Sequence, residues 1–340
     1  MAARRGDTLL FERMPVIASH AAVGGKKEGE GPLAAEFDEL FPDNNCGQAN
    51  WETAEKILQL RAARLCLKKA HATEKQVSLV LAGDLQAQCT ASSYALRELH
   101  LPFVGLFGAC STMAEALGLG AALCSAGLAD GLLAMTSSHF CAAERQFRTP
   151  LSYGAVRTPT AQWTATAAGC CLLHPAGQGV GIAAATFGRV EDYQIKDINN
   201  MGAAMAPAAA ATLLRYLHDT GQEPKDFDAI YTGDLGHLGS RLFREILTAE
   251  GLVMKNHIDC GSILYDAARQ NVKSGGSGPG CCAAVLCGHI LPRLERGSYR
   301  RVLVIATGAL MSQTTFLQKE SIPAIAHLVE LRGPECSARG

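Results

Sequence analysis

Cys110 is the residue of this sequence best placed to take part in chemistry. It follows Gly108, which ends the apolar run 101–107, and it precedes Ser111 and a segment rich in Ala, Leu and Gly that continues to Gly127. Apolar residues recur in that segment at helical spacing, so we expect a short buried strand, a turn and a buried helix. Unpaired N–H groups at the start of a helix favour an anion or a thiolate. Cys110 is therefore a candidate nucleophile or ligand-binding residue, with simple core packing as the alternative.

Three further polar residues follow apolar runs that we expect to be strands. Asp84 and Asp234 each stand in a Gly-Asp-Leu string, and His139 ends the run 131–139. The ligand crevice of an open parallel sheet lies at the carboxyl ends of its strands, so we expect these residues near Cys110. The carboxylates would bind a cation or hold a donor, and His139 would act as a base. The alternatives are a cap or turn for each Asp and a structural hydrogen bond for His139.

Arginine and serine side chains add to these candidates. Arg145 and Arg148 lie three residues apart, so on a helix they share one face, as a solvated surface or as a carboxylate clamp. The glycine-rich loop 275–280 contains Ser277 and leads into Cys281. It lacks the flanking residues of the known nucleotide-binding motifs, so the pattern gives only weak support for a nucleotide site.

The elements that must position these residues occur twice along the chain. Each half carries a strand that ends in Gly-Asp-Leu, a helix, a glycine-containing entry to a cysteine, an apolar helix and a further buried strand. The spacing from Cys110 to Leu132 is nearly the same as that from Cys281 to Val302, which indicates an internal duplication. The stretch from Gly-Asp-Leu to the cysteine is longer in the second half, so we expect an insertion within 253–273.

The alternation of strands and helices predicts the fold class. It is typical of an α/β protein with a largely parallel sheet covered on both faces. We expect two similar halves, residues 1–175 and 176–340, with an irregular segment over residues 1–50 at the start. A chain of 340 residues is long enough for two such halves around a shared core.

Composition narrows the class of protein further. The chain has 31 basic and 32 acidic residues, and this balance argues against a nucleic-acid partner. Its thirteen cysteines include no C-x-x-C pair, which favours reduced thiols in a cytosol-like compartment. The N-terminus lacks the apolar region of a signal peptide, and no apolar stretch approaches the about 18 residues of a membrane-spanning helix. Any membrane association would then be peripheral.

Five strings resemble the stage V sporulation protein AD family of endospore-forming bacteria, within the thiolase and ketoacyl-synthase superfamily. They are GACST at 108–112, AERQFR at 143–148, AAMAPAAA at 203–210, TGDL at 232–235 and KESIP at 319–323. The similarity extends from about Pro32 to Leu328. The resemblance implies a thiolase-like duplicated αβαβα core in five layers.

The resemblance also implies a function, a place and partners. A family member would be non-catalytic and would bind dipicolinic acid, or its calcium chelate, for uptake into the developing spore. It would need no cofactor beyond calcium carried by that ligand, and we expect no metal site in the protein itself. We expect a homodimer, peripheral at the inner spore (forespore) membrane beside the integral membrane proteins of the same stage V sporulation A operon.

The residues around Cys110 depart from the synthase pattern. Condensing enzymes stabilise their intermediate with a His and an Asn, or with a second His, beside the cysteine. No His occupies the turn at Asp234, and the loop 275–280, where the Asn would fall, contains none. Cys110 is therefore expected to be a vestigial nucleophile. The alternatives are a Cys110-dependent acyltransferase or condensing enzyme acting on an acyl-thioester, and a purely structural partner of the transport complex.

A dipicolinate site in this sequence would use donors, cations and a flat apolar slot. The residues proposed for it are Asp84, Cys110, Ser111, His139, Arg145, Asp234 and Ser277. The helix start at Cys110 would supply donors, and Arg145 or Arg148 would bind a carboxylate. Asp84 and Asp234 would repel a bare dianion unless they are protonated, bonded to a donor, or facing the calcium chelate. The sequence leaves the form of the ligand open.

Overall fold

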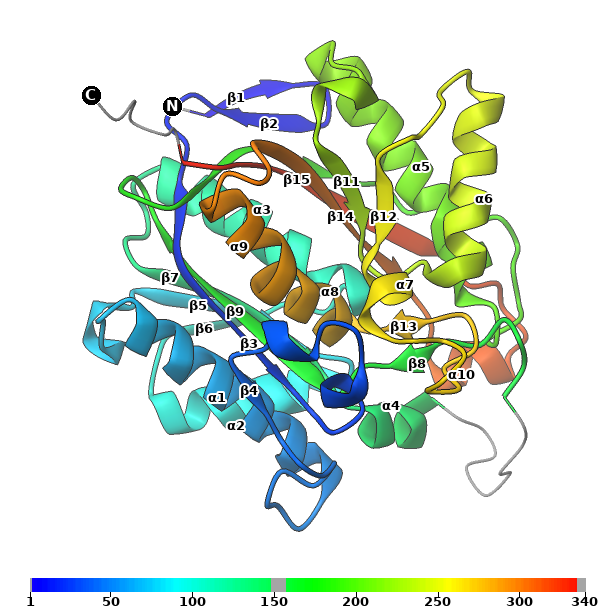
Figure 1. Ribbon diagram of the computed structural model, residues 1–340, viewed down its shortest axis with the longest axis horizontal. Helices are drawn as coiled ribbons and strands as arrows, with labels where there is room; N and C mark the ends of the chain where they lie inside the picture. Colours follow the sequence, from blue (N-terminus) through cyan, green and yellow to red (C-terminus); the bar gives the residue numbers. More distant parts are fainter. Residues whose placement is uncertain (1, 148–156, 335–340) are drawn as a thin grey trace.

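Two matching sets of five strands organise the computed structural model, which describes residues 2–147 and 157–334 (Figure 1). The first set has the order β3 (Val16–Gly24), β9 (Ala167–His174), β7 (Leu132–Ser138), β5 (Leu79–Gly83), β6 (Phe103–Gly105). The second set repeats it as β10 (Val180–Phe187), β15 (Ala324–Arg332), β14 (Arg301–Ala309), β11 (Ala229–Thr232), β12 (His257–Asp259). Antiparallel pairing of β3 with β10 joins the two sets. The expected limit between the halves, at residues 175 and 176, lies in the turn from β9 to β10.

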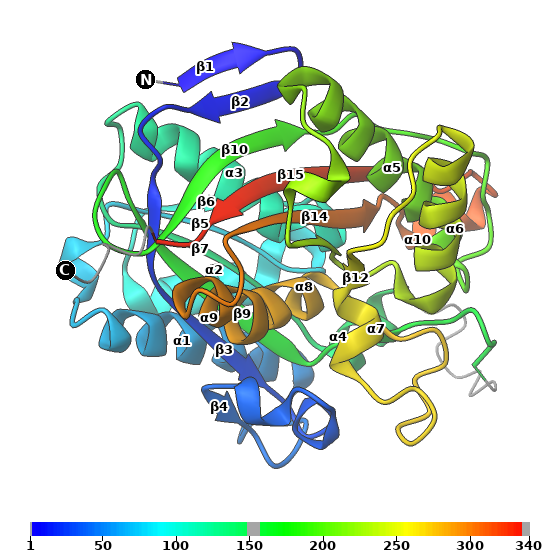
Figure 2. The ribbon, with the colours of Figure 1, turned by 45° about the horizontal axis from the view of Figure 1, so that its top comes forward.

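Helices fill three layers around these two sets of strands (Figures 1 and 2). The outer layers are α1 (Trp51–Lys69) with α2 (Thr90–Leu99), and α5 (Met201–Thr220) with α6 (Gly236–Ala249). The central layer holds α3 (Thr112–Ser125) and the run α8 (Pro279–Val285), a π-helical turn (Leu286–Ile290) and α9 (Leu291–Glu295). This is the five-layered αβαβα arrangement that the resemblance implied.

The central helix α3 lies between the two sets of strands, and its small residues allow this close packing. A methyl group at Gly120 would lie 2.9 Å from a Leu132 methyl and 3.0 Å from a Leu173 methyl. A methyl group at Gly118 would lie 3.1 Å from the Ala185 Cβ on the opposite side. A helix that is apolar all round is buried all round, so the composition after Cys110 predicts this central position.

Two local expectations need correction, and a third is located more closely. The segment expected to be irregular over residues 1–50 is so only after Gly24, because residues 2–24 contain β1 (Ala2–Arg5), β2 (Thr8–Phe11) and β3, and β3 lies in the middle of the sheet. The part from 25 to 50 holds 3₁₀ turns and the short strand β4 (Glu39–Leu40). The strand before Cys110 is not buried, because β6 is an outermost strand and Val104 is 46% exposed. The extra residues of the second half lie between β12 and α8, mostly within the expected range 253–273, where they form α7 (Cys260–Leu264) and, just beyond that range, β13 (Gly276–Ser277).

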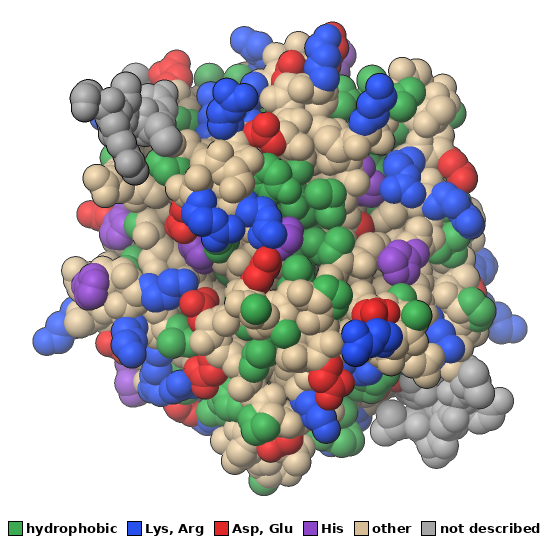
Figure 3. Space-filling view, in the orientation of Figure 1, with side chains coloured by type: hydrophobic (Ala, Val, Ile, Leu, Met, Phe, Trp, Pro, Cys, Tyr) green, Lys and Arg blue, Asp and Glu red, His purple; other side chains and the backbone are tan. Residues whose placement is uncertain are grey.

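Charges of both signs are interspersed on the face shown in Figure 3, with hydrophobic side chains scattered among them. None of the helices in the described ranges has the length and apolar character needed to cross a membrane.

Candidate functional site

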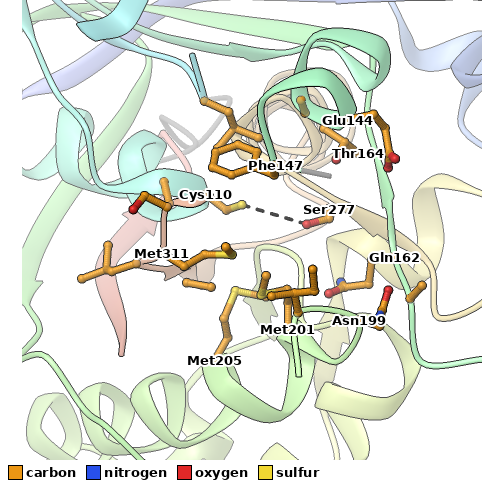
Figure 4. A pocket seen from close by; sticks show the side chains of 18 of the residues that line it. Cys110, Glu144, Phe147, Gln162, Thr164, Asn199, Met201, Met205, Ser277 and Met311 are labelled. Atoms are coloured by element: carbon orange, nitrogen blue, oxygen red, sulfur yellow. Dashed lines mark hydrogen bonds between the residues drawn. The ribbon is translucent and has the colours of Figure 1, made fainter. Parts of the chain in front are cut away.

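A cavity of about 710 Å³ opens above Cys110 (Figure 4). It lies between the turn before α3, the helix α4 (Phe140–Phe147), the start of α5 and the segment after β14, which includes α10 (Gln313–Leu317). Met201, Met205 and Met311 gather on one side of it, and Glu144 lies across from them in the view of Figure 4. The cavity therefore joins elements of both halves over one thiol.

Cys110 sits in a tight turn that the neighbouring strand holds in place. It belongs to a 3₁₀ turn (Ala109–Ser111) that leads into α3, and Ala109 has a left-handed φ of 53°. A methyl group at Gly308 of β14 would lie 2.4 Å from the carbonyl oxygen of Gly108, so only glycine lets this strand pass the turn. Cys110 is 8% exposed, and its Sγ lies 4.0 Å from the Ser277 Oγ.

Asp234 lies beneath this contact and is fully buried. Its Oδ2 accepts hydrogen bonds from the Ser277 hydroxyl at 3.0 Å and from the Gly278 N–H at 2.9 Å. Its Oδ1 accepts one from the Thr307 hydroxyl at 2.8 Å. Burial raises the pKa of Asp234, although these donors oppose the shift. The carboxylate is thus a fixed acceptor at the floor of the cavity rather than part of its lining.

The thiol of Cys110 is held in its protonated form. Burial, followed by the negative charge of Asp234, raises the pKa of Cys110 well above its usual value. The expectation that the helix start would favour a thiolate is therefore outweighed, because desolvation and a nearby carboxylate both disfavour the charged sulfur. Ser111 does not help, since its buried hydroxyl donates to the Gly108 carbonyl instead of facing the cavity.

A two-stranded sheet sets the position of Ser277. The strand β13 pairs in parallel with β8 (Trp163–Thr164), so that Ser277 lies opposite Thr164. Gly278 follows with φ 98°, and a methyl group there would lie 2.6 Å from the Ser138 hydroxyl oxygen. The glycines of the loop 275–280 thus serve close backbone packing at the cavity floor, and the loop does not have to cradle a phosphate.

Asp84 and His139 lie outside the cavity lining. Asp84 accepts hydrogen bonds from the Gln86 N–H and from the N–H and hydroxyl of Ser92, so it closes its own turn, as the structural alternative holds. The Nε2 of His139 lies 2.7 Å from the carbonyl oxygen of Asn44. Burial lowers the pKa of His139, and its ring is used by this local contact and not by the thiol.

Arg145 also turns away from the cavity. Its guanidinium pairs with the Glu52 carboxylate at 3.4 Å and lies over the Trp51 ring, 4.7 Å from the ring centroid. Helical spacing on α4 places it on the outer face, where it forms part of the solvated surface. Arg148, the other arginine considered for a carboxylate clamp, lies outside the described residues.

Arg157 is a cavity residue that the sequence pattern does not indicate. Its Nη1 lies 3.0 Å from the Glu144 Oε1, and its Nη2 donates to the Gln162 carbonyl oxygen. Arg157 lies in a segment without helical or strand periodicity, so no sequence signal distinguishes it from a surface arginine. Within the described ranges it is the one lysine or arginine that lines the cavity.

Sequence comparison identifies the family. A family model described as stage V sporulation protein AD matches residues 5–332. The chain belongs to the stage V sporulation protein AD family. Stage V sporulation protein AD of Bacillus subtilis (strain 168) is 42% identical over 322 residues, which are 94% of this chain and 95% of that protein.

Solved structures show the same fold at low sequence identity. 3-Oxoacyl-(acyl carrier protein) synthase III of Pseudomonas aeruginosa is 17% identical with a TM-score of 0.58, and the match covers 95% of this chain and 99% of that chain. A variant of OleA from Xanthomonas campestris is 12% identical with a TM-score of 0.61, covering 97% of this chain and 100% of that chain. The family member described here is a sporulation protein with a thiolase-like fold.

The structure places two residues of the second half beside the thiol. The turn after β11 brings Asp234 to Cys110, and the loop before α8 brings Ser277, as the sequence, which has no His or Asn at these places, led us to expect. In the part of the chain that the structure describes, no histidine lines the cavity. The residues Cys110, Asp234 and Ser277 come together as proposed, whereas Asp84, His139 and Arg145 do not join them.

Proposed function

We propose that this protein binds dipicolinic acid, free or as its calcium chelate, in the cavity above Cys110 and does not convert it. The observation that carries the proposal is the environment of the thiol, which meets the Ser277 hydroxyl at 4.0 Å and the negative charge of Asp234. A cysteine acylates as its thiolate, and both burial and the carboxylate oppose that form. Cys110 is therefore better suited to lining the cavity than to attacking an acyl group.

The cavity lining supports a flat ligand with charged ends. Its volume of about 710 Å³ lies within the usual range for small-molecule sites, of about 300–1,000 Å³. Phe107, Phe147 and the methionine side chains supply apolar faces for an aromatic ring, and Arg157 supplies a positive charge for a carboxylate. Polar side chains of the lining, among them Gln162, Asn199 and Ser277, would fix the orientation of such a ligand.

The proposal extends to the place and partners of the protein. Binding would serve dipicolinate uptake into the developing spore, with the protein peripheral at the forespore membrane beside integral proteins of the stage V sporulation A operon. A homodimer is the proposed assembly. The family assignment supports the sporulation context, and these finer statements follow from the resemblance in sequence.

Calorimetry of the purified full chain with dipicolinate, with and without calcium, tests the binding. We expect heat of binding in the wild type, a weaker affinity in Cys110→Ala, and no change in Cys124→Ala. Cys124 is a matched control because it lies buried on α3, the helix that follows the Cys110 turn, but does not line the cavity. No binding in either buffer would contradict the proposal.

The competing function is a Cys110-dependent acyltransferase or condensing enzyme. Incubation with an acyl-CoA, followed by intact mass measurement and peptide mapping, distinguishes the two. An acyl group on Cys110 of the wild type that is absent from Cys110→Ala would favour the enzyme. An unmodified thiol, together with dipicolinate binding, would support the non-catalytic function.

A further inference from the structure

The guanidinium of Arg157 lies beside an aromatic stack at the edge of the cavity. The rings of Phe140 and Trp163 are stacked with centroids 3.6 Å apart and an interplanar angle of 4°. The Cζ of Arg157 lies 5.5 Å from the first centroid and 5.3 Å from the second, and Lys27 Nζ lies 4.4 Å from the Trp163 centroid. Because Cζ is almost equally far from the two stacked centroids, the guanidinium lies beside the edges of both rings, and packing against them limits its position.

The wall of the cavity that carries Arg157 also carries Ser277, whose hydroxyl contacts the Cys110 thiol. Trp163 of β8 lies opposite Gly276 of β13, the residue before Ser277. Gln162, whose carbonyl oxygen accepts from Arg157, donates through Nε2 to the carbonyl oxygens of Asp234 at 2.6 Å and of Gly276 at 2.9 Å. A ligand in the cavity can therefore meet Arg157 along a wall whose spacing to the floor is fixed by backbone pairing.

The hydrogen bonds of Arg157 leave part of its fork for another acceptor. Nη2 donates to a backbone carbonyl and Nη1 meets the Glu144 carboxylate at 3.0 Å. Nε is buried and meets no acceptor among the described residues. A buried donor without a partner is unfavourable, and a carboxylate that binds a guanidinium through two oxygens satisfies more donors than the contact between Nη1 and Glu144 does.

We propose that Arg157 recognises a carboxylate of the ligand and that Glu144 is a built-in competitor for the same guanidinium. Binding exchanges the Glu144 contact for the ligand carboxylate, so the side chain of Glu144 sets how readily the ligand is held and released. Both residues line the cavity, and Glu144 belongs to α4 whereas Arg157 precedes β8. The identification of the ligand as dipicolinate rests on the proposed function, while the exchange applies to any carboxylate that enters the cavity.

Substitutions of Arg157 and of Glu144 are expected to change ligand affinity in opposite directions. This difference distinguishes ligand recognition from a purely structural role of the ion pair. Arg157→Gln should weaken dipicolinate binding about 30-fold, because a charge-assisted pair is lost. Arg157→Lys should recover only part of it, since an ammonium group offers no planar fork. Glu144→Gln should tighten binding about fivefold, because the competitor loses its charge. If the ion pair served stability alone, Glu144→Gln would weaken binding or leave it unchanged.

The experiment is calorimetry of the full-length variants in calcium-free buffer, with thermal unfolding measured on the same samples. Arg145→Gln is the matched control, because this arginine leaves α4 on its outer face and pairs with Glu52. It should bind like the wild type. A wild type that binds dipicolinate, with Arg157→Gln binding equally well, overturns the exchange and leaves the proposed function standing.

Pyridine-2-carboxylate is the second probe, and it separates failure of the exchange from failure of the proposed function. Binding of this monocarboxylate that is lost in Arg157→Gln and gained in Glu144→Gln supports the exchange even if dipicolinate does not bind. Absence of binding by both carboxylates in the wild type overturns the exchange, and the proposed function fails with it when dipicolinate does not bind in calcium-containing buffer either. A tighter Glu144→Gln variant cannot result from misfolding, so the result is decisive even if Arg157→Gln is unstable.

Discussion

The Gly-Asp-Leu turns of the two halves are alike in sequence but differ in their partners. Asp84 follows β5 and binds donors of its own half, from Gln86 and Ser92. Asp234 follows β11 and faces the thiol of Cys110, which the other half contributes. The duplication therefore yields two similar scaffolds but one site, with the sulfur from the first half and its neighbouring carboxylate from the second.

A third carboxylate explains why the two turns differ. Asp259 ends β12, and its oxygens accept hydrogen bonds from the two backbone N–H groups that follow Asp234, at 2.8 and 2.9 Å. Gly105 ends β6, the corresponding outermost strand of the first half, and has no side chain to offer. Asp84 must close its own turn, whereas Asp234 is left to face Cys110.

The largest expected effect concerns Glu55, which lies beside Asp84 and is fully buried with it. Burial, followed by the charge of Asp84, raises the pKa of Glu55 from 4.5 to about 8. The folded protein therefore keeps a proton that the unfolded chain releases, so stability falls as pH rises from about 4.5 to 8, by up to about 5 kcal/mol. Glu55→Gln should remove this slope in urea unfolding at several pH values. Equal slopes in both proteins would contradict the assignment.

The next prediction compares how much the Asp84 turn and the Asp234 turn contribute to the free energy of unfolding. Asp84→Ala leaves three buried donors, on Gln86 and Ser92, without their acceptor and should cost about 3 kcal/mol of unfolding free energy. Asp259→Ala should cost a similar amount, because it removes the acceptor that closes the turn of the second half. Urea unfolding measures both.

Ligand binding to Asp84→Ala provides the check on this interpretation. Asp84 reaches the cavity only through the adjacent Leu85, which lines it, so any loss of binding should follow the loss of stability. A variant with wild-type stability that fails to bind dipicolinate would place Asp84 in the site after all, against the comparison drawn between the two turns.

The sequence predicted what depends on neighbouring residues and missed what depends on distant ones. The Cys110 turn and the buried helix after it follow from local spacing, and so does the duplication. Asp84 and Asp234 look the same locally, and only Asp259, brought in by strand pairing, separates them. Helical spacing drew attention to Arg145, whereas Arg157 is placed by an aromatic stack between segments that no periodicity connects.

The smallest expected effect tests the contact between the halves through the reactivity of Cys110. The charge of Asp234 helps to raise the pKa of this thiol, so Asp234→Asn should lower that pKa and increase the thiolate fraction at a given pH. One pKa unit corresponds to about a tenfold rise in the rate of alkylation by iodoacetamide near pH 8. Peptide mapping of the modified protein measures the rate at Cys110 separately from the other cysteines.

Two controls make this result specific to the second-half turn. Cys141 serves as an internal reference, because its raised pKa results from burial and Glu144 and not from Asp234. Asp84→Asn should leave the rate at Cys110 unchanged, since that carboxylate binds donors of its own turn. Equal acceleration by both variants would mean that the two turns influence the thiol alike, and the division of roles between the halves would then be wrong.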